Sequence, residues 1–181
     1  LFRSVGGTAG QGTVFRLNRE GSGFRLLKSF GTSPGDGTRP VAALLEGSDG
    51  ALYGSTGQGG QFGFGTLFRL SEDGSQYQAL WSFAGTNDGA YPEGRLLEGS
   101  DGLLYGTASG GGTNDFGTLF RLGLNGSGFE PLFQFAGTNG ANPEGGLTEG
   151  SDGLLYGTSI SGGVPNGSYA SAGTAFSIAK G

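Results

Sequence analysis

The chain has 181 residues, of which 43 are glycine, 34% are hydrophobic and 12% are aromatic, and its formal net charge is −5. It contains no cysteine and no histidine, which excludes disulfides, thiolate chemistry and a histidine-based catalytic triad. The acidic balance argues against a nucleic-acid partner, and no run approaches the roughly 20 apolar residues of a membrane-spanning helix. A glycine-rich sequence with this share of aromatic rings is typical of many short strands joined by turns.

One ten-residue phrase recurs along the chain. It reads EGSDGALYGS at 46–55 and EGSDGLLYGT at 98–107 and 149–158, so successive copies are 52 and 51 residues apart. The phrase GT-x-F keeps a similar step, starting at Gly12, Gly65, Gly117 and Gly173. A fixed period near 50 residues is typical of propellers, solenoids and other repeat arrays.

Taken in chain order, the sequence begins inside one repeat and ends inside another. Residues 1–4 read LFRS where later copies read LYGT, so we expect the chain to start at the second strand of a unit. A complete unit is predicted to hold four strands, at residues 93–99, 103–108, 117–122 and 128–135, and the last unit to stop after its third. The prediction is a single repeat domain of about 14 strands. Its units are approximately 1–39, 40–91, 92–142 and 143–181.

Short turns separate the predicted strands. Asp101-Gly102 lies between the first two strands of the complete unit and Asn125-Gly126 between the last two. Tight hairpins prefer these dipeptides because both residues tolerate a positive φ. The recurring phrase is therefore predicted to be a β-hairpin.

The fourth strand of each unit shows a period of two. We expect its second copy to present on one face Tyr77, Ala79, Trp81 and Phe83. Pro131 indicates that this strand lies at a sheet edge, and Lys28 is expected to protect the edge by its charge. These features predict an all-β, β-propeller-like repeat of four-stranded antiparallel blades, with about three and a half units. A solenoid and a sandwich are the alternatives, since both also contain short strands at regular spacing.

The combined pattern P-x-G-x-L-x-EGSDG-x-LYGT, then a glycine-rich loop, then GT-x-FRL, resembles the GloVer-type tandem repeat of choice-of-anchor bacterial surface proteins. The matching positions of the complete unit are Pro92, Gly94, Leu96, Asp101, Gly102, Leu104, Tyr105, Gly106, Gly117, Thr118, Phe120 and Leu122. The resemblance covers almost the whole chain. It implies a secreted, repeat-built surface protein without established catalytic residues. The pattern departs at residues 1–4 and 175–178, and no anchor segment is visible in the sequence.

Three polar residue types recur once per repeat. The tyrosines are predicted to pack between neighbouring blades rather than to stack on a ligand, and the arginines to pair with acidic side chains rather than to form a basic ring. The glutamates that open the phrase lack the spacing of a calcium-binding EF-hand, so no metal is predicted. The three sets are Tyr53, Tyr105 and Tyr156; Arg16, Arg69 and Arg121; and Glu46, Glu98 and Glu149.

Long loops are expected on one face of the blades, opposite the short Asp-Gly turns, because successive turns of a meander alternate between its two ends. Binding residues are concentrated on such loops. Amide, carboxylate and aromatic groups suit the hydroxyls and apolar face of a sugar, although Asn and Asp are also ordinary loop residues. The candidate ligand-binding residues are Asn87, Asp88, Tyr91, Asn114, Asp115 and Tyr169.

No motif indicates catalysis. Neither G-x-S-x-G nor a nucleotide-binding glycine pattern occurs, so no enzyme and no cofactor are predicted. The leading hypothesis is a non-enzymatic secreted or cell-surface protein with a structural or adhesive role. A carbohydrate-binding, lectin-like propeller is the alternative, and a carboxylate-based hydrolase ranks third because no pair of acids is singled out.

The unit count predicts association between chains. Closed propellers typically have 4–8 blades, so about three and a half units fall short of a ring. Open terminal strands are templates for pairing, and we therefore expect a homo-oligomer or fibre formed through the terminal strand edges. A surface glycan is the alternative partner. The sequence begins at Leu1, so we expect a processed chain or a piece of a longer one.

Overall fold

The computed structural model describes residues 2–3, 6–163 and 172–181, and these form strands without any helix. The strands build four antiparallel sheets in succession. The first contains β1 (Phe2–Arg3), β2 (Thr13–Arg16) and β3 (Arg25–Ser29), and the second β5 (Leu45–Glu46), β6 (Leu52–Thr56), β8 (Thr66–Leu70) and β9 (Tyr77–Ser82). The third contains β10 (Leu97–Glu98), β11 (Leu103–Ala108), β12 (Thr118–Gly123) and β13 (Glu130–Gln134), and the fourth β14 (Thr148–Glu149), β15 (Leu155–Ser159) and β16 (Thr174–Ile178). The short strands β4 (Gly37–Thr38) and β7 (Gln58–Gly59) pair with each other.

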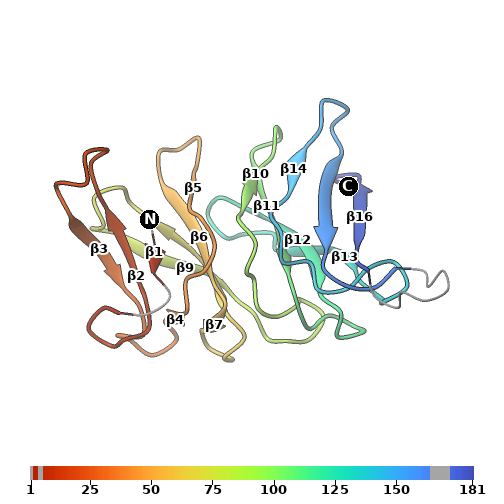
Figure 1. Cartoon of the computed structure of the whole chain (residues 1–181), viewed down its shortest axis with the longest axis horizontal. Coiled ribbons are helices and arrows are strands. Elements are labelled where there is room, and N and C mark those ends of the chain that lie inside the picture. Colours follow the sequence, from red (N-terminus) through yellow and green to blue (C-terminus); the bar gives the residue numbers. More distant parts are fainter. Residues whose placement is uncertain (1, 4–5, 164–171) are drawn as a thin grey trace.

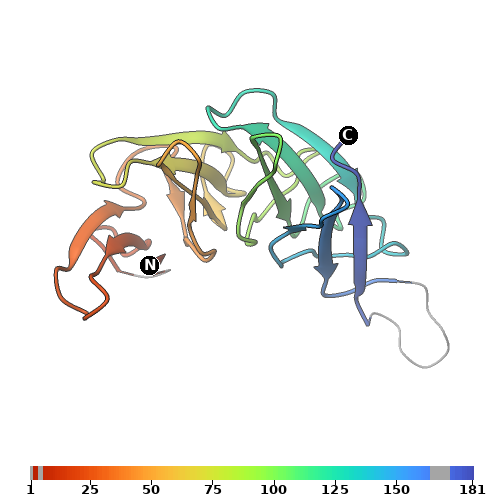
Figure 2. The ribbon, with the colours of Figure 1, turned by 90° about the horizontal axis from the view of Figure 1, so that it is seen from above.

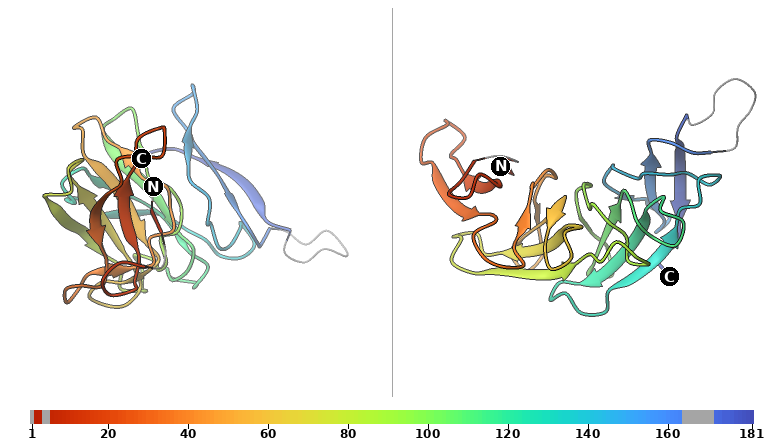
Figure 3. Two further views of the ribbon diagram at one scale, coloured as in Figure 1. Left: turned by 60° about the vertical axis from the view of Figure 1, so that its left-hand side comes forward. Right: turned by 90° about the horizontal axis from the view of Figure 1, so that it is seen from below.

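The four sheets stand side by side in an open arc, with the first and fourth sheets at its two ends (Figure 2 and Figure 3). Each is a meander whose strands pair with their neighbours in the chain, as in the blades of a propeller. Figure 1 shows the short hairpin turns on one side of the arc and the longer connections around β4 and β7 on the other. The prediction of an all-β, propeller-like fold is confirmed.

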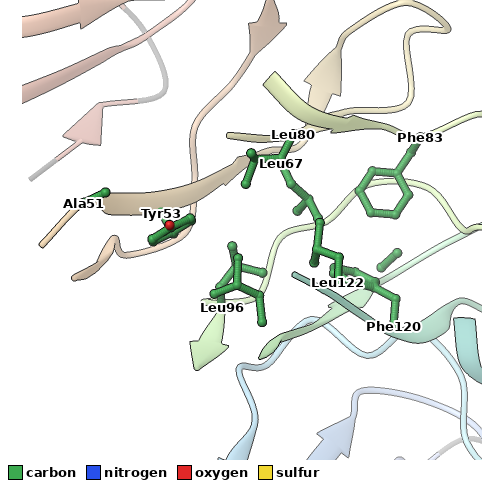
Figure 4. Close-up of a cluster of buried hydrophobic side chains, with 10 residues drawn as sticks. Ala51, Tyr53, Leu67, Leu80, Phe83, Leu96, Phe120 and Leu122 are labelled. Atoms are coloured by element: carbon green, nitrogen blue, oxygen red, sulfur yellow. The ribbon is translucent and has the colours of Figure 1, made fainter. Parts of the chain in front are cut away.

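The hydrophobic core lies between sheets rather than within one. Tyr53 and Leu67 of the second sheet pack in one cluster with Leu96 and Leu122 of the third (Figure 4). The other two interfaces, between the first and second and between the third and fourth sheets, have clusters of their own. Each sheet is therefore stabilised by its neighbours, as expected of a repeat protein.

The first strand of the complete unit is shorter than expected. The sequence predicts 93–99, whereas β10 covers Leu97–Glu98 only. The preceding residues contact the next sheet instead: a Cβ on Gly94 would lie 2.7 Å from the carbonyl oxygen of Gly145. This close backbone approach replaces a strand ladder over residues 93–96.

A β-bulge interrupts the fourth strand and corrects the expected alternation. Leu67 pairs with Trp81, but Phe68 pairs with Ala79, so Leu80 is the extra residue. Leu80 is buried and Ala79 is exposed, the reverse of the expectation from a strict period of two. The same register shift recurs in the first and third sheets.

The edge position of the fourth strand is confirmed, but the role expected for Lys28 is wrong. β13, which contains Pro131, is the last strand of its sheet. The Lys28 ammonium lies 2.9 Å from the Asp36 carboxylate and 4.1 Å from the centre of the Tyr77 ring in the next sheet. Its charge therefore joins two sheets by an ion pair and a cation–π contact, and does not guard an open edge.

Candidate functional site

The recurring hairpin contains a tyrosine and an aspartate that bond to each other and to an arginine on the strand that follows. Tyr53 donates its hydroxyl proton to Asp49 at 2.9 Å, and Arg69 donates to the same carboxylate at 2.8 Å. Burial alone would raise the pKa of Asp49, but hydrogen bonds from Arg69, Ala51 and Tyr53 outweigh it and lower the pKa. The triad is thus a structural unit with an ionised acid at its centre.

The predicted pairing of the repeated arginines is confirmed for two of the three. Arg69 pairs with Asp49, and Arg121 pairs with Glu130 at 2.8 Å. For Arg16 no ion pair is found within the described part of the chain. Arginines held by acids on their own sheets do not form a basic ring for an anionic ligand.

The glutamate that opens the phrase links one repeat to the preceding one. Glu98 accepts hydrogen bonds from the backbone N–H of Ser48, at 2.8 Å, and from its hydroxyl. Glu149 accepts the same two bonds from Ser100, at 2.8 and 2.6 Å. Each carboxylate therefore holds the serine of the preceding EGSDG turn by two hydrogen bonds, a contact that we call the clamp. This contact could not be predicted from the sequence, although the serine and the glutamate recur with the phrase.

Three bonds hold the last of these glutamates. Lys180 donates to Glu149 at 2.7 Å and also to the hydroxyl of Ser100 at 2.8 Å. The hydrogen bonds from Lys180 and then from Ser100 lower the pKa of Glu149 to about 2. Among the residues that the structure describes, no group of three or more Asp, Glu, His or Cys side chains is arranged to hold a metal ion.

The repeated tyrosine is buried at interior positions of the arc and exposed at its end. Tyr53 and Tyr105 are 0% exposed, and each packs against the following sheet. Tyr156, at the same position of the fourth sheet, is 42% exposed. The packing interpretation is thus confirmed for the two interior residues.

The candidate loop residues lie on adjacent loops, where most bond to the protein. Gln134 joins the two loops, because its side-chain amide donates to the Asn87 carbonyl at 2.8 Å and accepts from Thr113 N–H at 2.9 Å. Asn114 donates to the carbonyl of Phe135 at 3.3 Å. No hydrogen bond joins the side chains of the candidates that the structure describes, and Tyr169 lies outside the described residues. Their role in binding stays a prediction.

Tyr91 has a left-handed backbone conformation, and its backbone hydrogen bonds connect two sheets. It has φ of 59°, and the equivalent residues Arg39 and Asn142 have 57° and 55°. Tyr91 N–H donates to the Phe64 carbonyl of the second sheet at 2.9 Å, and its own carbonyl accepts from Ser109 N–H of the third at 3.1 Å. The sequence gives no signal for this position, because left-handed backbone is uncommon for residues other than glycine.

Asp88 lines the wall of a shallow groove beside β9. The groove has a volume of about 340 Å³, and Phe62 and Trp81 line it together with Asp88. One oxygen of Asp88 accepts from Trp81 Nε1 at 3.3 Å and from Ala84 N–H at 2.9 Å, and the other is buried without a protein partner. In this groove a predicted ligand-binding acid lies beside the exposed ring of Phe62.

Two other carboxylates influence each other. Burial raises the pKa of Glu93, and the nearby Glu144 carboxylate raises it further. Glycosidases use such a pair of carboxylates, and the nearby charge of Arg39 opposes the rise in the pKa of Glu93.

Comparison with known proteins agrees with this architecture. A family model described as the Gloeobacter/Verrucomicrobia repeat matches residues 2–180. A search of curated proteins found no significant match. A chain of a nidogen/laminin complex is similar with a TM-score of 0.57 and 16% identity, over 83% of this chain and 50% of that one. A protein named as a gluconolactonase is similar with a TM-score of 0.53 and 19% identity, over 92% of this chain and 60% of its own.

These two structures are β-propellers, and at such low identity the likeness shows the fold alone. The chain spans between half and three-fifths of their length. No described segment forms a helix of the length and apolar character needed to cross a bilayer.

Proposed function

Because the chain belongs to the Gloeobacter/Verrucomicrobia repeat family, we propose that it is a non-enzymatic, secreted or cell-surface protein with a structural or adhesive role, which self-associates through the two ends of its arc. One observation carries this proposal: residues at positions that are buried or half-buried in the interior interfaces are exposed at both ends of the described arc. Apolar surface of this kind marks sites of association.

At the end formed by the fourth sheet, Tyr156 is 42% exposed, whereas Tyr53 and Tyr105 are 0% exposed. At the other end, Phe24 of the first sheet is 66% exposed. Its equivalent in the third sheet, Phe129, stacks on Trp81 with ring centres 4.0 Å apart. Each end therefore presents one half of the interface that holds neighbouring sheets together.

Light scattering of the purified chain over a range of concentrations tests this proposal. The mass is expected to rise above 18.2 kDa as the concentration increases. Tyr156→Asp should shift the association to higher concentration, because it places a charge in the contact. Phe62→Asp, which changes an aromatic residue that is 52% exposed on a loop, is the matched control and should leave the mass unchanged. A mass of 18.2 kDa at every concentration would contradict self-association.

The groove beside β9 favours carbohydrate binding as a second candidate function. Trp81 and Phe62 offer apolar surface, and the Asp88 side chain lines the same groove. Aromatic rings and carboxylates together bind the apolar face and the hydroxyls of sugars. A glycan array tests this function: binding should be saturable and lost in Phe62→Ala, and in Asn87→Ala or Tyr91→Ala if the loop candidates contribute. Absence of binding to every glycan would remove this candidate.

A further inference from the structure

A lysine of the first sheet lies against a carboxylate in a site that is shielded from water. Lys28 Nζ is 2.9 Å from Asp36 Oδ2, and the two side chains are 15% and 2% exposed. The ammonium lies 4.1 Å from the centre of the Tyr77 ring and 5.7 Å from that of Phe30. An amino group and a carboxyl group are therefore held together among aromatic rings.

The two oxygens of Asp36 have different surroundings. Oδ2 also accepts a hydrogen bond from the backbone N–H of Thr32 at 3.3 Å. Oδ1 and the Tyr77 hydroxyl oxygen are both buried, and neither has a hydrogen-bond partner among the described residues. Burial and then the nearby Asp36 carboxylate raise the pKa of Tyr77, so a protonated hydroxyl lies beside the acid.

The other repeats show that the fold does not need a lysine here. By the step of the repeat, Trp81 and Phe133 occupy its position in the second and third sheets. Trp81 Nε1 donates to Asp88, the equivalent of Asp36, at 3.3 Å. The indole N–H makes the same hydrogen bond as the ammonium, but it does not form an amide with a carboxyl group. Of these three repeats, the first alone combines an amine with the acid.

We propose that Lys28 and Asp36 condense into an amide cross-link within the chain. The lysine nitrogen bonds to Cγ of Asp36 and gives up two protons. These protons leave with one carboxyl oxygen as a water molecule, so an ammonium and a carboxylate become one neutral amide, and no other reactant is consumed. The bond closes a loop over residues 28–36, where the chain passes from the first sheet towards the second.

Three features of the site favour this reaction. The two groups are already in contact, which removes much of the entropic cost of bringing them together. Shielding from water favours the neutral product over a pair of charges. The Thr32 N–H stabilises negative charge on Oδ2 when the nitrogen has added to Cγ, and the Tyr77 hydroxyl passes a proton to the departing oxygen.

The intact mass of the denatured full chain tests the proposal. The wild type is expected to be lighter than its sequence by the mass of one water molecule. Lys28→Arg should have its full mass, because a guanidinium keeps the ion pair without forming the amide. Lys180→Arg is the matched control: it removes the chain's other lysine, which lies 2.7 Å from Glu149, and should keep the loss of water. A wild type of full mass after prolonged incubation would overturn the cross-link.

Digestion with trypsin locates the lost water. Asp36 precedes Gly37, and closure of an Asp-Gly peptide to a succinimide loses the same mass. The amide blocks cleavage after Lys28, so residues 26–69 should remain one fragment that lacks one water. Cleavage after Lys28 in chains that have lost water, or a loss that persists in Lys28→Arg, would overturn the cross-link.

Tyr77→Phe tests the proton transfer separately. This change keeps the ring beside the ammonium and removes the hydroxyl, so the linked chain should accumulate at least ~10-fold more slowly after cell-free synthesis. Tyr53→Phe, which removes the hydroxyl that bonds to Asp49, is the matched control and should keep the rate of the wild type. Equal rates for Tyr77→Phe and the wild type would overturn the role of the Tyr77 hydroxyl.

Discussion

The tyrosine that recurs once per repeat is buried in the interior sheets and exposed in the fourth sheet. Tyr105 is enclosed by the third and fourth sheets, while Tyr156 has the same hydrogen bond to the aspartate of its turn but packs against no further sheet among the described residues. Its local geometry is therefore set by the hairpin, and its burial is set by the presence of a following sheet.

Truncation of these two residues should have very different effects. Tyr105→Ala is expected to lower the free energy of unfolding by about 3–5 kcal/mol, because it leaves a cavity in an inter-sheet core. Tyr156→Ala at the matching position should cost only a small part of that. Urea unfolding at low protein concentration, where association is weakest, measures both, and equal losses would contradict the packing assigned to Tyr105.

The clamp on Glu149 predicts a dependence of stability on acid. Its pKa falls from the ordinary value of 4.5 to about 2 on folding, so the unfolded chain binds more protons between these values. The stability contributed by the ionised form is present above about pH 4.5 and is lost as the pH falls towards 2. The melting temperature of wild type should therefore fall more steeply in this window than that of Glu149→Gln. Glu20→Gln, in an exposed turn, is the control and should keep the pH dependence of the wild type. A melting temperature of the wild type that falls no more steeply than that of Glu149→Gln would contradict the role assigned to Glu149.

At the scale of the element, a turn glycine of one sheet packs against the bulge of the preceding one. A Cβ on Gly126 would lie 2.8 Å from the carbonyl oxygen of Leu80, and one on Gly74 the same distance from that of Leu27. A Cβ on Gly21 of the first sheet would meet nothing within 4 Å. The bulge and the glycine turn are thus two halves of one contact between repeats.

Alanine at these turns separates backbone strain from packing. Gly126 and Gly21 have φ of 84° and 77°, so both substitutions should cost about 1–2 kcal/mol of strain. Gly126→Ala should cost a further ~1–3 kcal/mol, because its methyl group overlaps the backbone at Leu80. Thermal unfolding compares the two variants, and losses of the same size would refute the contact.

Much of the fold could be predicted from the sequence, because repeated dipeptides such as Asp101-Gly102 define hairpins by their local conformation alone. The bulge at Leu80 could not, since a period-two pattern gives the same residues with or without one extra residue. The strand at β10 was predicted but its short length was not, because the shortening depends on a backbone approach to Gly145 in the next repeat.

The candidate site was predictable only in part. Packing of Tyr53 and pairing of Arg69 could be predicted because each residue type recurs at the same position of the repeat, as structural residues do. The bond from Ser48 to Glu98 joins residues 50 positions apart, and only the fold brings them together. Asp88 was chosen as a loop acid, and the structure adds Trp81 and Phe62 as its neighbours in the groove.

At the scale of the whole molecule, the described residues form an arc with a different sheet at each end (Figure 2). It spans about half the length of the nidogen/laminin chain that shares its fold. Contacts between unlike ends are heterologous, so they close into a ring when the rotation permits and otherwise extend into a fibre.

Negative-stain imaging of the purified chain, at concentrations where light scattering gives a mass above 18.2 kDa, tests the association of the ends most directly. We predict rings or fibres built from arcs joined end to end, which disappear in Phe24→Ser. Particles that stay single arcs, or assemblies in which the arcs meet through their loops with both ends free, would contradict it.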